Sequence, residues 1–224
     1  MSSNGISRQH ALFSPSQPAW LNYSAEEFQE RLIGKFRPGV GTAIHDWAFT
    51  QIKLGQKQTG SNRELQKDIK TYIFQTYFDY RTNDISLDGA LLLKALKYIS
   101  PEVLSTVKNY INDAVGFMME PEVEVRYSEN FFGTTDAILY KDNFLRIHDL
   151  KTGTMPAHIE QLLIYAALYS LQHRIDPFKI QSELRIYQND TILVANPTGE
   201  DIRPVMDKII ECDKIMTKFI GGAL

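Results

Sequence analysis

The sequence of 224 residues has one cysteine, Cys212, which excludes a disulfide framework and any zinc or iron–sulfur site built from four cysteines. It has no run of about eighteen apolar residues, the length that a transmembrane helix requires. The first ten residues are polar and lack the apolar centre of a secretion signal. We therefore expect a cytoplasmic protein without a membrane partner.

The sequence also lacks an excess of positive charge. Its 24 Lys and Arg residues against 27 Asp and Glu residues give a net charge of −3 and a pI near 6.0. Domains that bind nucleic acid are often strongly basic, so this balance at first disfavours such a partner. However, residues 1–120 have a net charge of +1 and residues 121–224 a net charge of −4. Cations bound by some of those carboxylates would make the region attractive to phosphate, so DNA is not excluded.

The apolar fraction of 43% is enough for one packed core, and the spacing of apolar residues changes once along the chain. Helical spacing and capping signals predict helices over 16–22, 24–34, 41–54, 62–80, 87–99 and 100–119. After Pro121, alternation predicts strands over 123–127, 131–140, 144–151, 179–187 and 191–195, with helices over 157–172 and 200–220. We predict one α/β domain, 1–224, whose core at 121–224 follows a mainly helical elaboration at 1–120.

Two aspartates and a lysine are predicted to meet at one end of the sheet. Asp149 and Lys151 are two residues apart on a strand and project to the same side, and Asp136 is on the preceding strand across a tight turn. Two carboxylates can hold one or two Mg²⁺ ions against a phosphodiester, and a lysine can position or help deprotonate the attacking water. By itself, such an Asp-x-Lys pattern is most often a solvated strand face with a weak ion pair.

Three further side chains have both a functional and an ordinary interpretation. His45 is a reasonable ligand for Mn²⁺ and less so for Mg²⁺, although a lone histidine on a helix is usually a core or surface residue. Glu122 and Glu124 alternate on the strand before Asp136. Either glutamate could add a carboxylate or orient a water, and both could instead form an exposed strand face.

Gln161 and Tyr165 are four residues apart and therefore share one face of a predicted helix. Their amide and phenol could contact a DNA phosphate or brace Lys151. In an otherwise apolar helix they could also mark only its polar edge.

Together, these motifs resemble the RecB-like branch of the PD-(D/E)XK nuclease superfamily. That branch has Gly-Thr-x-x-His, Gly-x-x-Asp, Asp-x-Lys followed by Thr-Gly or Tyr-Gly, and Gln-x-x-x-Tyr, in this order. The matching segments here are 41–45, 133–136, 149–153 and 161–165. The segment His10–Ser16, with Trp20 and Leu21 after it, is similar to the opening of phage-encoded members.

The resemblance implies a restriction-endonuclease-like core, in which helices flank a central mixed sheet. It implies that His45, Asp136 and Asp149 bind Mg²⁺ or Mn²⁺ and that Lys151 is the catalytic lysine. The spacing of thirteen residues between the two aspartates is typical of the branch.

The resemblance also bears on the remaining candidates. Glu124 matches the acidic position before the Gly-x-x-Asp strand better than Glu122 does, and Gln161 and Tyr165 would support the site or touch DNA. Some relatives bind an iron–sulfur cluster through cysteines near both termini. The expected N-terminal position is Tyr23 here, so we expect no cluster.

We therefore predict a metal-dependent DNA nuclease. The expected type is an exonuclease acting on single- or double-stranded linear ends during phage-type replication, recombination or degradation, in the host cytoplasm if the chain is phage-encoded. The sequence has no Gly-x-x-x-x-Gly-Lys-Ser/Thr loop, so no nucleotide cofactor is expected and unwinding would need a separate helicase, recombination or replication protein. Two alternatives remain: a structure-specific endonuclease of the same fold, and a non-catalytic DNA-binding or assembly subunit.

Overall fold

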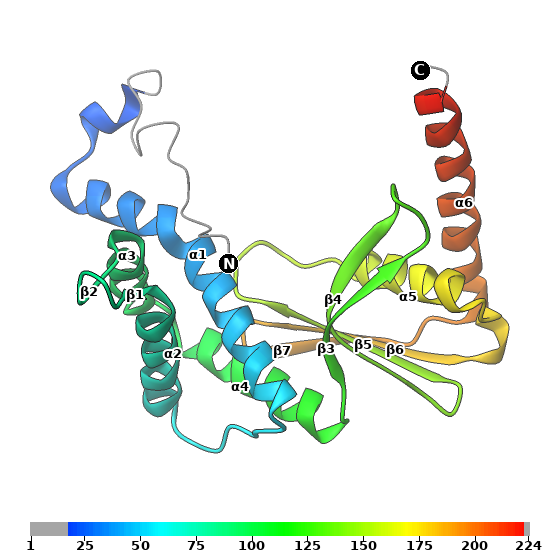
Figure 1. Ribbon diagram of the computed structural model, residues 1–224, viewed down its shortest axis with the longest axis horizontal. Helices are drawn as coiled ribbons and strands as arrows, with labels where there is room; N and C mark the ends of the chain where they lie inside the picture. The colour runs from blue at the N-terminus through cyan, green and yellow to red at the C-terminus, as the bar shows by residue number, and fades with distance from the viewer. Residues whose placement is uncertain (1–17, 222–224) are drawn as a thin grey trace.

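The computed structural model describes residues 18–221 (Figure 1). The motif at His10–Ser16 lies outside the described residues. The first element is a short 3-10 helix, η1 (Pro18–Asn22), which lies inside the segment predicted at 16–22. Within the described range, no helix combines the length and the apolar character needed to cross a membrane.

One long helix, α1 (Ala25–Lys53), takes the place of two predicted helices. It begins at Ser24, which forms a complete capping box. The prediction that the helix ends at Gly34 was wrong, because the helix continues through Gly34 and Pro38. Pro38 cannot donate a hydrogen bond to the preceding turn, and α1 bends along its length (Figure 1). Phe36, which lies between Gly34 and Pro38 in the sequence, is buried and keeps this stretch of the helix packed on the core.

Three more helices follow, each with a serine at its N-cap: α2 (Asn62–Tyr77), α3 (Leu87–Leu96) and α4 (Pro101–Gly116). The prediction that the first of these extends to residue 80 was wrong. The carbonyl of Tyr77 accepts a hydrogen bond from the Ser86 N–H at 3.0 Å, and the chain forms a short hairpin there. Its two strands are β1 (Phe78–Asp79) and β2 (Asp84–Ile85).

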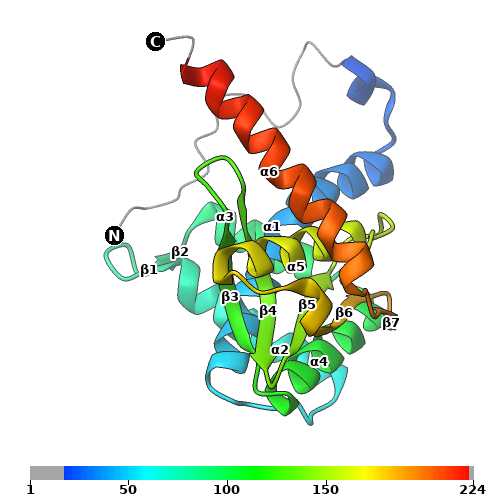
Figure 2. The same cartoon turned by 90° about the vertical axis from the view of Figure 1, so that its right-hand side faces the viewer.

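The central sheet has five strands in the order in which they occur along the chain (Figure 2). They are β3 (Glu120–Arg126), β4 (Phe132–Lys141), β5 (Phe144–Lys151), β6 (Gln181–Gln188) and β7 (Thr191–Ala195). Only β5 and β6 pair in parallel, and the crossover between them contains α5 (Glu160–His173) and the 3-10 helix η2 (Pro177–Lys179). The mixed sheet flanked by helices confirms the predicted fold class.

The sheet separates two apolar cores. On one face, Leu150 and Tyr187 pack with residues of α1 to α4. On the other face, Ile147 and Leu162 pack in the core formed with α5 and the last helix, α6 (Gly199–Gly221) (Figures 1 and 2). Because β5 lies in the middle of the sheet, its C-terminal end is within reach of both α1 and α5. The candidate motif residues lie at this end.

Candidate active site

Asp149 and Lys151 contact each other at the end of β5. The Nζ of Lys151 donates a hydrogen bond to Asp149 Oδ1 at 3.0 Å. Asp149 Oδ2 lies 3.0 Å from the same ammonium in an ion-pair contact, but it is buried and accepts no hydrogen bond from the described residues. Asp149 is only 4% exposed, whereas the side chain of Lys151 is 32% exposed. The pair therefore combines a buried carboxylate with an ammonium that reaches solvent.

Asp136 joins this pair from β4, as the sequence predicts. The β4–β5 register pairs Ala137 with His148, which places Asp136 opposite Asp149 one step further along. The Leu150 N–H donates to Asp136 Oδ2 at 2.7 Å. The Nδ1 of His45, on α1, lies 3.6 Å from the same oxygen. Strand pairing and helix packing thus bring three separate motifs to one place.

Glu122 lies closer to the aspartates than Glu124 does. In the β3–β4 register, the residues on both sides of Glu122 pair with the residues on both sides of Asp136, so these two carboxylates are opposite each other. Burial raises the pKa of Glu122, and the charges of Asp46 and Asp136 raise it further. Glu124 instead accepts a hydrogen bond from Arg126 Nε at 2.8 Å in a partly exposed ion pair.

The structure therefore does not bring Glu124 to the aspartates. Glu122 instead lies beside them, where we expected Glu124. The β3–β4 register explains the difference, because Glu122 lies opposite Asp136 whereas Glu124 pairs with Thr134. The preference for Glu124 came from the family resemblance. Glu122 also has a φ of 51°, in the left-handed region that non-glycine residues rarely adopt. Such backbone strain is often found at functional sites.

Gln161 and Tyr165, on α5, form a chain of hydrogen bonds that ends at the lysine. Gln161 Oε1 accepts from Lys151 Nζ at 3.0 Å, and Gln161 Nε2 donates to the Tyr165 hydroxyl at 3.1 Å. The ring of Tyr165 lies against Gly133, where an added Cβ would be 2.8 Å from Tyr165 Cε1. The glycine of the Gly-x-x-Asp motif therefore makes room for the tyrosine that supports the lysine.

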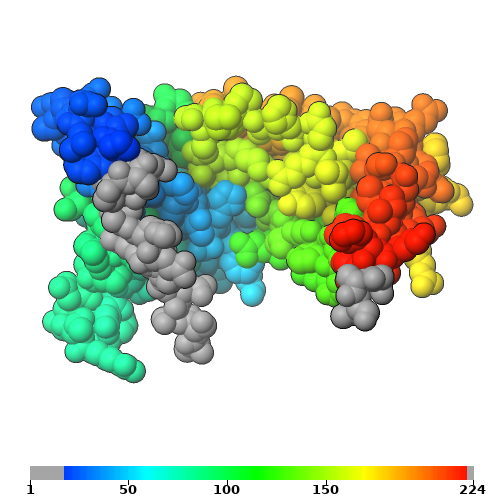
Figure 3. All heavy atoms as spheres, turned by 90° about the horizontal axis from the view of Figure 1, so that it is seen from above, coloured from blue at the N-terminus to red at the C-terminus, as the bar shows by residue number. Residues whose placement is uncertain are grey.

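A cleft of about 920 Å³ opens beside these residues, between α1, the α3–α4 connection and the loop after β5. Figure 3 shows that loop, in yellow-green, beside the blue helix α1. His45, Asp46 and Glu122 form part of the wall. Gly41 allows the close approach of helix and loop, because a Cβ there would be 2.8 Å from Thr152 Oγ1. Gly41, the glycine of the Gly-Thr-x-x-His motif, therefore has a packing role, as Gly133 does.

The carboxylates of the site are short of positive charge. Burial and the charge of Asp136 raise the pKa of Asp149 to about 6, although Lys151 and His45 act in the opposite direction. Burial lowers the pKa of His45, but its contact with Asp136 and the charges of both aspartates outweigh that effect, so the net shift is upward. The site therefore favours the binding of further positive charge.

Asp46 is a member of the cleft that the sequence analysis missed. Its pKa is raised by burial, and its negative charge contributes to the raised pKa values of Glu122, Tyr72 and Tyr77. Adjacency to His45 was the only signal in the sequence. Neighbouring residues on a helix point in different directions, so that adjacency did not place the two side chains in one cleft.

The family model of the PD-(D/E)XK nuclease superfamily matches residues 19–196. No solved structure matches the chain. The matched range contains all five strands of the sheet and every candidate residue from His45 to Tyr165. The chain therefore belongs to the PD-(D/E)XK nuclease superfamily.

Proposed function

We propose that the protein hydrolyses phosphodiester bonds of DNA with Mg²⁺ or Mn²⁺ and that it is an exonuclease. The observation that carries the proposal is the cluster of Asp136, Asp149 and Lys151 beside an open cleft, in a chain that belongs to a nuclease superfamily. The non-catalytic alternative has less support, because the carboxylates and the lysine of the motif are all present.

The side chains of the site offer the kinds of donor atom that a hard divalent cation takes. Asp149 has a buried oxygen that accepts no hydrogen bond from the described residues, and its pKa is raised to about 6 even though Lys151 is adjacent. Among residues 18–221, no three His, Cys, Asp or Glu side chains are already gathered closely enough to hold an ion. Asp136, Asp149 and Glu122 offer the carboxylate oxygens that Mg²⁺ prefers, and His45 adds a nitrogen suited to Mn²⁺. A bound ion would supply positive charge that stabilises the charge developing on the phosphate.

Lys151 would act on the water and the phosphate. Its ammonium is held between Asp149 and Gln161, each at 3.0 Å, and it remains one-third exposed. A cation fixed in this way can orient the attacking water and stabilise negative charge on the phosphate without reorganising during the reaction. Gln161 and Tyr165 are positioning residues, because they act through the lysine.

The two glutamates of β3 give a matched test of the site. We expect Glu122→Gln to lower the rate of DNA hydrolysis by about 10- to 100-fold, because it removes a carboxylate opposite Asp136 that a metal ion would use. Glu124→Gln should hydrolyse DNA at the wild-type rate. Both rates are measured with end-labelled linear DNA over a range of Mn²⁺ concentrations. Equal rates for the two variants would contradict the assignment of Glu122.

A substitution at Gly133 tests the support of the lysine. We expect Gly133→Ala to lower kcat by about tenfold, because the new methyl group would displace Tyr165 and thereby loosen Gln161 from Lys151. The matched control is Gly34→Ala, at a position where a Cβ meets no atom within 4 Å. Circular dichroism checks that both variants are folded. A normal kcat for folded Gly133→Ala would show that this packing does not support catalysis.

The exonuclease part of the proposal is supported by the order of the motifs and their resemblance to the RecB-like branch. It is tested with end-labelled linear, nicked and covalently closed circular DNA in the presence of Mg²⁺ or Mn²⁺. An exonuclease degrades the linear DNA and leaves the closed circles intact, and EDTA abolishes the reaction. Cutting of the closed circles would instead favour the endonuclease. We further propose that the protein acts in phage-type DNA replication, recombination or degradation, with a separate helicase, recombination or replication protein supplying any unwinding.

A further inference from the structure

Five cationic side chains gather on neighbouring faces of α2 and α3, away from the aspartates and the lysine of the site. We call this set the α2–α3 basic surface, and its members are Arg63, Lys67, Lys70, Lys94 and Lys97. The three on α2 are separated by four and three residues and therefore share one helix face. Lys94, on α3, is three residues before Lys97, the C-cap residue of that helix. All five are exposed, and none forms an ion pair with another described residue.

The acid beside this surface is already engaged. Among the described residues, Glu64 is the only acid that lines the hollow between α2 and α3. Its carboxylate accepts hydrogen bonds from the N–H and the hydroxyl of Ser61, at 2.7 and 2.8 Å, in the capping box of α2. Like charges four residues apart on a helix are destabilising. Glu64 also interacts electrostatically with Lys67, but none of the five cations forms an ion pair with a described residue. Their gathering is therefore better explained by an external anion than by stability of the fold.

The basic surface is continuous with the cleft of the candidate active site. Four of its members line a hollow of about 480 Å³ between α2 and α3. Lys94 and Lys97 line a second hollow, of about 430 Å³, between α1 and α3. Lys97 belongs to both hollows, and Tyr98 belongs to the second hollow and to the cleft. The three concave regions thus adjoin at the corner between α3 and α4.

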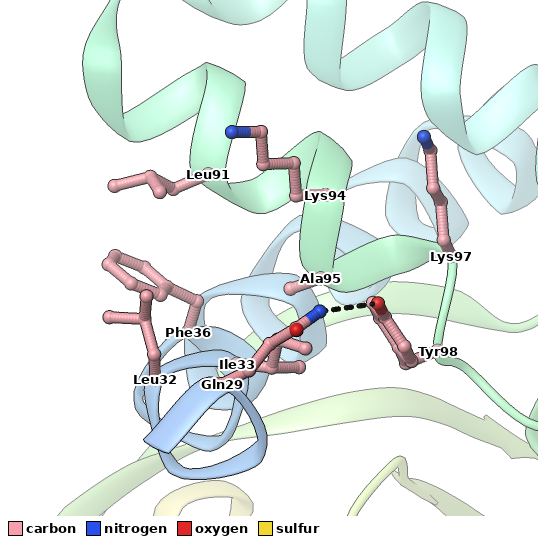
Figure 4. A pocket seen from close by; sticks show the side chains of 9 residues that line it. All are labelled: Gln29, Leu32, Ile33, Phe36, Leu91, Lys94, Ala95, Lys97 and Tyr98. Carbon is pink, nitrogen blue, oxygen red and sulfur yellow. Dashed lines mark hydrogen bonds between the residues drawn. The ribbon is translucent and has the colours of Figure 1, made fainter. Parts of the chain in front are cut away.

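Figure 4 shows how this corner is arranged. The ammonium groups of Lys94 and Lys97 extend in the same direction, away from the α1 side chains of the second hollow. Gln29 Nε2 donates a hydrogen bond to the Tyr98 hydroxyl at 3.3 Å, which ties α1 to the corner. Tyr98, at the same corner, is 53% exposed. The corner therefore presents both cations and an aromatic ring, as nucleic-acid-binding channels do.

We propose that the α2–α3 basic surface binds the phosphodiester backbone of the nucleic-acid strand that leads to the cleft. The inference rests on the proposed nuclease function for the identity of the anion. Successive phosphates along one strand match a row of cations spread over two helices, whereas a small anion would occupy only one or two of them. The surface supplies the positive charge that the acidic core at 121–224 lacks.

The test is a triple variant of the full chain, Arg63→Gln with Lys67→Gln and Lys70→Gln. Glutamine has nearly the same helix propensity as lysine and arginine, so α2 should remain folded. Binding of a labelled DNA strand of about 30 nucleotides is measured by fluorescence anisotropy in EDTA, where no hydrolysis occurs. We expect binding about tenfold weaker, and a slope of log affinity against log salt that is smaller by about 2 for single strands and about 3 for duplex.

The control variant removes the same charges at the other end of the molecule. It combines Arg203→Gln, Lys214→Gln and Lys218→Gln on α6, which lies opposite α2 and α3 (Figures 1 and 3). It should bind the strand like the wild type, although its net charge equals that of the first variant. Equal weakening by both variants, or by neither, would overturn the proposal.

A short substrate separates this proposal from the nuclease proposal. With Mn²⁺, the α2 variant should hydrolyse a tetranucleotide at the wild-type rate and the long strand more slowly, because only the long strand reaches the basic surface. If the wild type hydrolyses DNA and the α2 variant hydrolyses both substrates at the same rates, the proposed role of the basic surface is wrong and the nuclease proposal is retained. If the wild type hydrolyses neither substrate and, of the two variants, only the α2 variant loses DNA binding, the nuclease proposal is wrong and the proposed role of the basic surface is retained.

Discussion

Asp149→Asn is expected to lower the rate of metal-dependent DNA hydrolysis by at least about a thousandfold and, at the same time, to stabilise the fold at about pH 8 in EDTA. The loss of activity follows from removing a charged oxygen that the site offers to a cation. The gain in stability follows from the burial of that charge, since Asp149 is only 4% exposed. Asparagine has nearly the same shape and no charge to desolvate.

The sign of the stability effect comes from the raised pKa. Burial first, and then the charge of Asp136, raise the pKa of Asp149 from 3.8 to about 6. Between these values Asp149 binds more protons in the folded chain than in the unfolded chain. Its contribution to stability therefore falls as the pH rises through this interval and stays constant above it. The full difference corresponds to about 3 kcal/mol of unfolding free energy. The loss of the ion pair with Lys151 offsets part of this, so we expect a gain of about 1–2 kcal/mol.

Urea unfolding in EDTA, at about pH 4 and about pH 8, measures this effect in both proteins. At about pH 8 the wild type should be less stable than Asp149→Asn. Added Mn²⁺ should stabilise only the wild type. If Asp149→Asn is less stable than the wild type at about pH 8, or if it still hydrolyses DNA, the account of Asp149 as a buried metal ligand is contradicted.

The second large effect is expected for Lys151→Ala, which should lower kcat by about 10²- to 10⁴-fold while leaving the affinity for DNA largely unchanged. The ammonium is held by Asp149 and Gln161 at a fixed place beside the cleft. We therefore expect it to contribute to the rate of hydrolysis rather than to the affinity for the DNA strand. Steady-state hydrolysis and anisotropy binding in EDTA separate the two quantities.

Lys141→Ala is the matched control, because Lys141 is an exposed lysine at the far end of the same pair of strands. It should hydrolyse DNA at the wild-type rate. Full activity in Lys151→Ala would show that this lysine has no part in the reaction. A loss of DNA affinity equal to the loss in kcat would show that the lysine only binds the strand.

Local patterns in the sequence predicted the centre of the site well. Strand alternation and a tight turn are short-range features, and they correctly predicted that Asp136, Asp149 and Lys151 lie together. The spacing of four between Gln161 and Tyr165 likewise predicted that both lie on one helix face, and the structure shows the first of them hydrogen-bonded to Lys151. Such contacts depend on neighbours in sequence or on the next strand.

The errors arose where tertiary structure overrides a local rule. Gly34 and Pro38 are breaking signals, yet α1 continues through them because packing on the core holds the helix together. Alternation predicts only that Glu122 and Glu124 share one strand face, and the resemblance favoured Glu124. The β3–β4 register, which brings Glu122 opposite Asp136 and Glu124 opposite Thr134, separates the two. The place of Asp46 in the cleft depends on how α1 packs beside the loop after β5, a contact between segments far apart in the sequence.

The most direct test of the central claim is the rate at which end-labelled linear DNA is hydrolysed as Mn²⁺ is added, for the wild type and for Asp136→Asn purified in parallel. Asp136 lies opposite Asp149 and touches both His45 and the Leu150 N–H, so its charge belongs to the same site. We predict saturable, Mn²⁺-dependent hydrolysis by the wild type and a rate at least about a thousandfold lower for the variant. Equal rates for the two proteins, or no hydrolysis by the wild type at any Mn²⁺ concentration, would contradict the account.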